Sequence, residues 1–167
     1  MLKIIISSIL SILIFAGYTG AQTNFAEKCL GVWEGTMKIY AAGALKDTVK
    51  VRLTVAKTAK PDEYTWKTEY LSPTRPVVKD YRLRVEDAAK GVYVTDEGDG
   101  VELVNYLFED KLYNVFEVDG IVLTAVYERR GAELIFEVTS GKKLNEIKGV
   151  TNFSVANLQR VVFKKIK

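Results

Sequence analysis

The sequence predicts an all-β protein, an antiparallel up-and-down meander of about eight to ten strands that closes into a barrel. Three observations support this fold class. Apolar and polar residues alternate along most of the chain after residue 31. Turn-forming pairs such as Asp99-Gly100 and Asp119-Gly120 recur about ten residues apart from residue 99 onward. No segment has a helical pattern long enough for the crossovers of a parallel α/β fold.

The first 21 residues are typical of a secretory signal peptide. Lys3 supplies one positive charge, residues 4–15 are almost wholly apolar, and Thr19-Gly20-Ala21 has the small-x-small pattern of a cleavage site. We therefore expect cleavage after Ala21, a single domain over residues 22–167, and export to the periplasm or the medium. A retained membrane anchor is the rival interpretation, but a spanning helix needs roughly 20 apolar residues.

The first strands are predicted from alternation alone. In the first, Trp33, Met37 and Ile39 share one face, and the next three segments alternate in the same way. Such strands have one face on a core and one in water. The later strands lie between regular turns, expected at Asp99-Gly100, Glu109-Asp110, Asp119-Gly120, Arg130-Gly131 and Ser140-Gly141.

Asp-Gly between apolar runs is the strongest short hairpin signal, and strands joined so tightly are neighbours in the sheet. A meander of this length would expose long edges unless it closed on itself. Leu144 and Ile147 are three residues apart, so residues 140–157 are expected to form a short helix or a loop before the last strand. The predicted strands span residues 32–40, 48–57, 63–71, 76–86, 90–95, 101–109, 112–118, 121–129, 132–139 and 159–166.

The composition excludes several chemistries. The chain has no histidine and one cysteine, so it has no Ser-His-Asp or Cys-His site and no histidine-bound zinc or haem. It also lacks a phosphate-cradling glycine loop and a dinucleotide fingerprint. We expect no catalytic residue, no metal and no cofactor, with a carboxylate-based hydrolase as the remaining enzymatic alternative. Cys29 is expected to be a half-buried structural thiol.

Charge excludes one class of partner. The net charge of +3 falls to +2 without Lys3, which is too small to indicate nucleic acid. The acidic stretch 96–102 offers clustered oxygen atoms to calcium. Its spacing does not match an EF-hand, however, and Asp and Gly are common in turns for conformational reasons.

Aromatic residues and two asparagines are the candidate ligand-binding residues. Most aromatic side chains on strands belong to a core, but in a hollow barrel one subset would line an apolar cavity. Two amides fall in register with apolar neighbours, so each is either a structural hydrogen-bonding group or a group that orients a ligand. The cavity candidates are Trp66, Tyr81, Asn105, Asn114, Phe116, Tyr127 and Phe136.

Gly31-Val32-Trp33 on the first strand, the meander, the irregular segment and a terminal strand with Arg160 resemble the calycin superfamily of lipocalin-like and fatty-acid-binding-protein-like barrels. The resemblance implies that Trp33 and Arg160 meet and close one barrel mouth, where an indole face would suit a guanidinium group. The chain departs from both groups: it lacks the lipocalin Thr-Asp-Tyr turn and long helix. It also lacks the two helices and the Arg…Arg-x-Tyr motif of fatty-acid-binding proteins. The resemblance therefore implies a barrel but no particular ligand.

Together these features predict an exported barrel that binds a small hydrophobic or amphipathic ligand in its interior. The alternative is a non-catalytic barrel with a filled interior, which binds a macromolecular partner by its rim. A stable membrane span is not expected, and the oligomeric state is left open.

Overall fold

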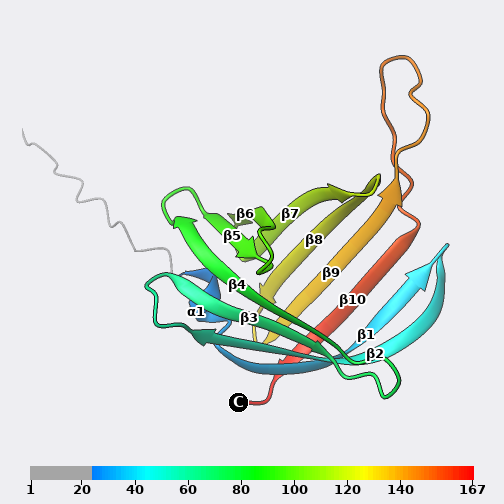
Figure 1. The fold of residues 1–167 in the computed structure, drawn as a ribbon. Helices are drawn as coiled ribbons and strands as arrows, with labels where there is room; N and C mark the ends of the chain where they lie inside the picture. The colour runs from blue at the N-terminus through cyan, green and yellow to red at the C-terminus, as the bar shows by residue number, and fades with distance from the viewer. Residues whose placement is uncertain (1–23) are drawn as a thin grey trace, which may run out of the picture.

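The computed structural model describes residues 24–167, in which ten antiparallel strands form one closed barrel (Figure 1). The expected signal peptide and its cleavage site lie outside the described residues. Each strand pairs with its neighbours in sequence, and the last strand pairs with the first, so the predicted closed meander is confirmed. The elements are α1 (Phe25–Lys28), β1 (Gly31–Ala41), β2 (Ala44–Lys57), β3 (Glu63–Tyr70), β4 (Val77–Asp87), β5 (Val92–Asp96), β6 (Glu102–Phe108), β7 (Lys111–Val118), β8 (Ile121–Arg130), β9 (Glu133–Lys142) and β10 (Asn157–Lys165).

Two turns differ from the prediction. The first turn is shorter than expected, and the strands on either side of it are correspondingly longer. Ala42 and Gly43, with φ values of 48° and 77°, connect β1 to β2 in two residues. The turn expected at Ser140-Gly141 is wrong, since both residues lie within β9. Gly141 is required there for a different reason: a Cβ atom would collide with the backbone carbonyl oxygen of Ser154.

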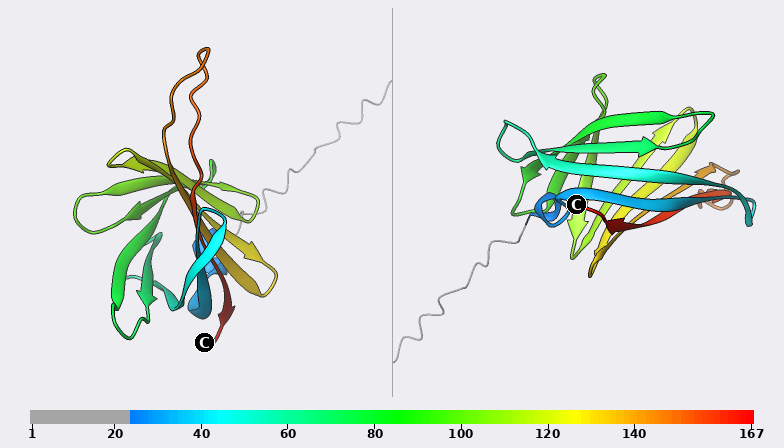
Figure 2. Two further views of the ribbon diagram at one scale, coloured as in Figure 1. Left: turned by 90° about the vertical axis from the view of Figure 1, so that its right-hand side faces the viewer. Right: turned by 90° about the horizontal axis from the view of Figure 1, so that it is seen from below.

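Residues 143–156 form a loop, so of the two predicted alternatives the helix is wrong. The loop doubles back through the isolated bridges Lys143 to Phe153 and Ile147 to Val150. Its base is fixed where the amide of Ser154 donates to the carbonyl of Lys142 at 2.8 Å. The loop projects from one end of the barrel (orange in Figure 1), opposite the end that carries α1 (Figure 2, right).

Helix α1, which the sequence analysis did not predict, closes the other end. Asn24 caps it by accepting a hydrogen bond from the amide of Ala26 at 2.9 Å. Phe25 is fully buried, and its backbone amide donates to the Tyr93 hydroxyl at 2.9 Å. Lys28 forms an ion pair with Asp110 on the β6–β7 turn at 2.8 Å. Four residues thus act as a plug that is attached to several strands.

Trp33 joins β1 to this plug, but its cationic partner is not the one expected. Its indole Nε1 donates to the carbonyl of Cys29 at 2.7 Å, and the guanidinium carbon of Arg129 lies 4.9 Å from its ring centroid. Arg129 also donates through Nε to the carbonyl of Lys28 at 3.2 Å. Arg129 of β8 therefore joins β1 to α1 at the closed end.

The predicted pairing of Trp33 with Arg160 is wrong. Trp33 lies opposite Lys165 across the β1–β10 ladder, whereas Arg160 lies opposite Lys38. Arg160 is five residues from Lys165 along β10, so it lies roughly 17 Å along the strand from the position opposite Trp33. Arg160 also points outward, because the alternate residue Val161 faces the core, and it forms an exposed ion pair with Glu137 at 3.2 Å.

Cys29 is more deeply buried than expected, with no exposed surface. Burial raises the pKa of its thiol to about 12. A thiolate is the reactive form of cysteine, so this residue is an inert part of the closed end.

The packed core occupies the half of the barrel next to α1. Along β2, the inward residues Val51, Leu53 and Val55 are buried and alternate with partly exposed outward residues. Along β8, in contrast, the inward residues Leu123, Ala125 and Tyr127 all keep accessible surface. The barrel is therefore filled at one end and hollow toward the other.

Candidate functional site: a cavity open at one end of the barrel

The hollow half contains an inner cavity of about 190 Å³. Its lining follows a two-residue period on β3 to β10, because alternate side chains of a strand face the same side of the sheet. All seven predicted cavity candidates line this space. The lining residues are Trp66, Thr68, Tyr70, Lys79, Tyr81, Thr95, Glu97, Leu103, Asn105, Leu112, Asn114, Phe116, Leu123, Ala125, Tyr127, Phe136, Val138 and Gln159.

An aromatic floor separates the cavity from the packed core. Trp66 and Tyr127 come from β3 and β8, which lie on opposite sides of the barrel, and their rings meet edge to face at 5.1 Å. Phe136 stacks on Tyr127 at 4.3 Å. On the other side of Trp66, Phe25 of α1 lies 6.3 Å away. The floor is apolar and is held in place from below by the plug.

Two buried amides face the cavity and differ in how their hydrogen bonds are satisfied. The Asn105 amide nitrogen donates to the hydroxyl of Thr95 at 3.0 Å and to the carbonyl of Leu103 at 2.8 Å. The Asn114 amide nitrogen donates to the carbonyl of Val104 at 2.6 Å. Asn114 Oδ1 is the one buried side-chain polar atom in residues 24–167 that receives no hydrogen bond from another described residue.

Two phenol groups add polarity without charge. Burial raises the pKa of Tyr127, and burial together with nearby Glu97 raises the pKa of Tyr81. Both hydroxyl groups therefore stay protonated at physiological pH. They can donate or accept hydrogen bonds inside an otherwise apolar space.

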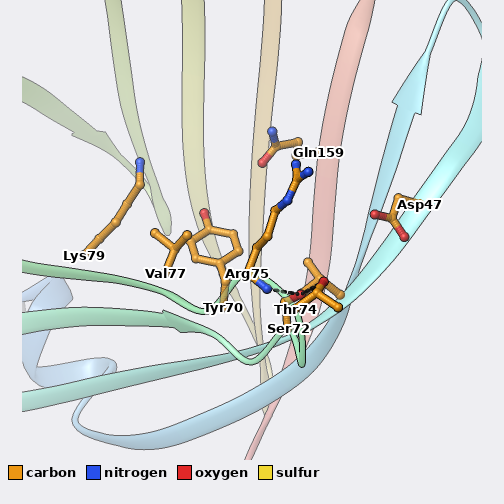
Figure 3. Close-up of a pocket in the computed structure, with 9 residues that line it drawn as sticks. Asp47, Tyr70, Ser72, Thr74, Arg75, Val77, Lys79 and Gln159 are labelled. Atoms are coloured by element: carbon orange, nitrogen blue, oxygen red, sulfur yellow. Dashed lines mark hydrogen bonds between the residues drawn. The ribbon is translucent and has the colours of Figure 1, made fainter.

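The cavity leads into a wider mouth at the end opposite α1 (Figure 3). The mouth has a volume of about 710 Å³ and shares Tyr70, Lys79 and Gln159 with the inner cavity. Figure 3 shows the Arg75 side chain reaching from the β3–β4 loop toward Gln159. The other lining residues of the mouth are Asp47, Val49, Ser72, Thr74 and Val77.

The mouth carries side chains of both charges, and its two cationic side chains are those of Arg75 and Lys79. Neither Arg75 nor Lys79 belongs to an ion pair formed within residues 24–167. The Lys79 ammonium lies 5.6 Å from the Tyr81 ring centroid. The two carboxylates of the site, Asp47 and Glu97, line different parts of it. The arrangement can therefore hold a polar group at the mouth, and it brings no carboxylate pair together for hydrolysis.

Sequence reasoning missed several lining residues that the same alternation indicates. Thr68 and Tyr70 continue the face of Trp66, and Ala125 continues that of Tyr127. Arg75 lies on a loop, where alternation has no predictive value. The metal alternative for residues 96–102 gains no geometric support, since residues 24–167 contain no group of three Cys, Asp or Glu side chains arranged to bind an ion.

A second, exterior hollow lies on the outer wall over β6 and β7. It has a volume of about 510 Å³, and its walls are mainly apolar. Phe108 and Val115 are 63% and 66% exposed. We call this surface the outer hollow; it is lined by Val104, Tyr106, Phe108, Tyr113, Asn114 and Val115.

The fold is calycin-like, as the resemblance of the first strand, the meander, the irregular segment and the terminal strand implied. The chain is similar to the S-type phycobiliprotein lyase CPES from Guillardia theta, with 10% identity, coverage of 86% of this chain and 91% of that chain, and a TM-score of 0.60. It is also similar to Rv2717c from M. tuberculosis, with 14% identity, coverage of 84% and 94%, and a TM-score of 0.54. At these identities the likeness shows the fold alone.

Sequence comparison adds no closer relative. No protein-family model matches the chain, and no curated protein matches it. Within residues 24–167, no helix has the length and apolar character needed to cross a membrane.

Proposed function

We propose that this protein is an exported carrier that shelters a small hydrophobic or amphipathic ligand inside the barrel. The observation that carries the proposal is the lining of the inner cavity: side chains from eight successive strands enclose a mainly apolar space above the Trp66–Tyr127 floor. Removing apolar ligand surface from water in such a space supplies the binding energy, and a few polar groups set the orientation.

Size and polarity suggest how a ligand lies in the site. An engineered cavity of about 150 Å³ holds benzene, so an inner cavity of about 190 Å³ suits one ring or a short alkyl segment. The rest of a larger ligand would occupy the mouth. There Arg75 and Lys79 can contact its polar end, which makes an amphipathic molecule the best fit.

A second candidate function rests on the outer hollow. Exposed aromatic and branched side chains gathered on one face are typical of a surface that contacts another macromolecule. Phe108 and Val115 are the most exposed side chains of this surface, and a partner bound there would not require ligand uptake in the cavity. Replacing Phe108 with Ser would weaken such an interaction and leave uptake in the cavity intact.

The test is a fluorescence titration of the purified chain beginning at Gln22 with an environment-sensitive apolar dye, followed by displacement with fatty acids and sterols. We expect saturable enhancement of dye emission and quenching of Trp66 emission. Absence of uptake by a folded protein would overturn the carrier proposal and favour a partner on the outer wall.

A matched pair of variants locates the binding. Ala125→Phe adds a ring inside the cavity, whereas Thr124→Phe adds the same ring on the opposite face of β8. We expect the first variant to lose dye uptake and the second to keep it. Circular dichroism of both variants checks that overpacking, which costs about 1–3 kcal/mol, has not unfolded the barrel.

Export is tested separately by expressing the full-length chain in a secretion-competent host. Mass spectrometry of the protein recovered outside the cytoplasm should give an N-terminus at Gln22. Recovery of the uncleaved chain in the cytoplasm would contradict export.

A further inference from the structure

The wall of the barrel is interrupted between β6 and β7. The two strands share three residue pairs beside their connecting turn, from Tyr106–Tyr113 to Phe108–Lys111. Residues 102–105 of β6 pair with β5, and residues 114–118 of β7 pair with β8, but no ladder joins these two segments to each other. In Figure 1, β7 runs on beside β8 away from the short β5–β6 hairpin. Because Asp110 on the connecting turn is bound to α1, the interruption opens toward the mouth.

The two segments that lack a common ladder have a hollow space on each side. On the inner face, Leu103 of β6 and Phe116 of β7 line the inner cavity. On the outer face, Val104 and Val115 line the outer hollow, with exposed fractions of 52% and 66%. All four side chains are apolar, so the interruption has apolar borders. A group that passed between the strands would move from the outer hollow directly into the inner cavity.

Asn114 lies where these two spaces meet. It shares the inner face of β7 with Leu112 and Phe116, and all three residues line the inner cavity. Asn114 also lines the outer hollow, which an inward side chain can do only where no neighbouring strand covers it. Its amide nitrogen donates to the backbone carbonyl of Val104 at 2.6 Å and joins the strands just past their last pair. A side-chain hydrogen bond opens more readily than a continuous ladder, so local opening is easiest along this line.

We propose that the interruption between β6 and β7 is a side entrance to the inner cavity, and that the outer hollow is the apolar site where a ligand binds first. This inference rests on the proposed carrier function and adds its route of uptake, for an amphipathic molecule whose apolar end enters first. A route of entry changes the rates of uptake and release, but it leaves the equilibrium affinity unchanged.

Charge favours this route over the mouth. An apolar group that entered through the mouth would pass the charged side chains of Asp47, Arg75 and Lys79 and displace water from them. An apolar group that enters from the outer hollow stays in contact with Val104 and Val115. Because the interruption opens toward the mouth, the polar end of the ligand can remain in water throughout and come to lie near Arg75 and Lys79.

The experiment links the two strands across the interruption and measures the rate of dye uptake by stopped-flow fluorescence. Val104→Cys with Val115→Cys places two thiols on the outer face, where a bis-maleimide reagent joins them, while Cys29 is fully buried and does not react. We expect linkage to slow uptake and release of the apolar dye by at least about tenfold, with the Kd unchanged. The matched control links Thr36→Cys to Lys50→Cys across the continuous β1–β2 ladder, and its rates should stay the same.

The outcomes separate this inference from the carrier proposal. Equal rates before and after linkage, with the link confirmed by mass spectrometry, would overturn the side entrance, leave the carrier function standing and assign the outer hollow to a macromolecular partner. Equal slowing in the β1–β2 control would also overturn it. If the native protein takes up no dye at equilibrium, the carrier proposal fails, and the side entrance fails with it.

Asn114→Ala gives a second test that needs no linkage and decides the question if the reagent does not join the two cysteines. Removing the hydrogen bond to the Val104 carbonyl should speed both uptake and release of the dye. Unchanged or slower rates in this variant would contradict the side entrance.

Discussion

A single side chain, Trp33, connects three parts of the closed end. It extends from β1, donates to the backbone just after α1, and contacts Arg129 of β8. Trp33→Phe keeps an aromatic ring but leaves the buried carbonyl of Cys29 without its donor. We expect this change to lower the free energy of unfolding by about 2 kcal/mol, measured by urea denaturation.

Arg160→Ala is the control for that measurement. Arg160 and Glu137 are each 42% exposed in their side chains, and exposed pairs contribute less than about 1 kcal/mol. Equal losses for Trp33→Phe and Arg160→Ala would contradict the assignment of Arg129, rather than Arg160, to the closed end.

Cys29 makes stability depend on alkaline pH. Its thiol pKa is raised from 9.0 to about 12 by burial, so the folded protein retains this proton to higher pH than the unfolded chain does. The resulting stability is fully present below pH 9 and is lost as the pH rises through 12. Burial also raises the pKa of the Tyr64 hydroxyl from 10.0 to about 12, which changes stability with pH in the same direction.

We therefore expect the free energy of unfolding to fall between pH 9 and pH 12, with a shallower fall in Cys29→Ala. The slope, measured by denaturation at several pH values, is the relevant quantity because the substitution also changes packing. Identical slopes for the two proteins would show that the Cys29 thiol does not titrate differently on folding.

At the scale of elements, α1 contributes far more than its four residues suggest. Phe25 is fully buried and contacts Trp66 and Tyr93. Phe25→Ala should cost about 3–5 kcal/mol in the free energy of unfolding, because it leaves a void beneath the aromatic floor. Glu27→Gln, on the exposed face of the same helix, should leave the thermal midpoint nearly unchanged. A small effect of Phe25→Ala would mean that α1 does not seal the barrel.

In the 143–156 loop, we expect the base to contribute to stability and the tip to contribute little. Leu144, Ile147 and Val150 at the tip are exposed. Replacing residues 144–152 with Asn-Gly joins the bridged residues Lys143 and Phe153 by a two-residue turn. We expect the melting temperature to stay within about 4 °C of the native value.

Gly141→Ala tests the base of the same loop. Because its Cβ would collide with the Ser154 carbonyl, this single methyl group should lower the melting temperature more than the nine-residue replacement does. The reverse order would indicate that the loop tip contributes to folding.

At the scale of the whole molecule, stability should be distributed unevenly around the barrel. The β1–β2 ladder pairs all of β1, whereas β6 and β7 share three residue pairs. Short ladders open more readily by local unfolding. Hydrogen exchange followed by mass spectrometry should show β6 and β7 exchanging well before β1 and β2. Uniform protection around the barrel would contradict this gradient.

The sequence predicted features that depend on one strand or one turn. Alternation placed Trp66, Tyr127 and Phe136 on inner faces, and Asp-Gly pairs marked the later hairpins. Features that depend on distant segments escaped prediction. A four-residue helix has no detectable period, and the contact of Arg129 with Trp33 depends on which strand end meets α1. Likewise, Asn114 is notable only because the β6–β7 ladder stops beside it.

The Trp66–Tyr127 contact across the barrel has an evolutionary consequence. It divides the interior into a sealed compartment that holds the fold together and an accessible compartment, the inner cavity. Substitutions above the contact, at Ala125, Leu123 or Phe116, can change the shape of the accessible compartment without disturbing the packing around Trp33. The shape of the inner cavity can therefore change, by drift or by design, while the sealed half maintains the stability of the fold.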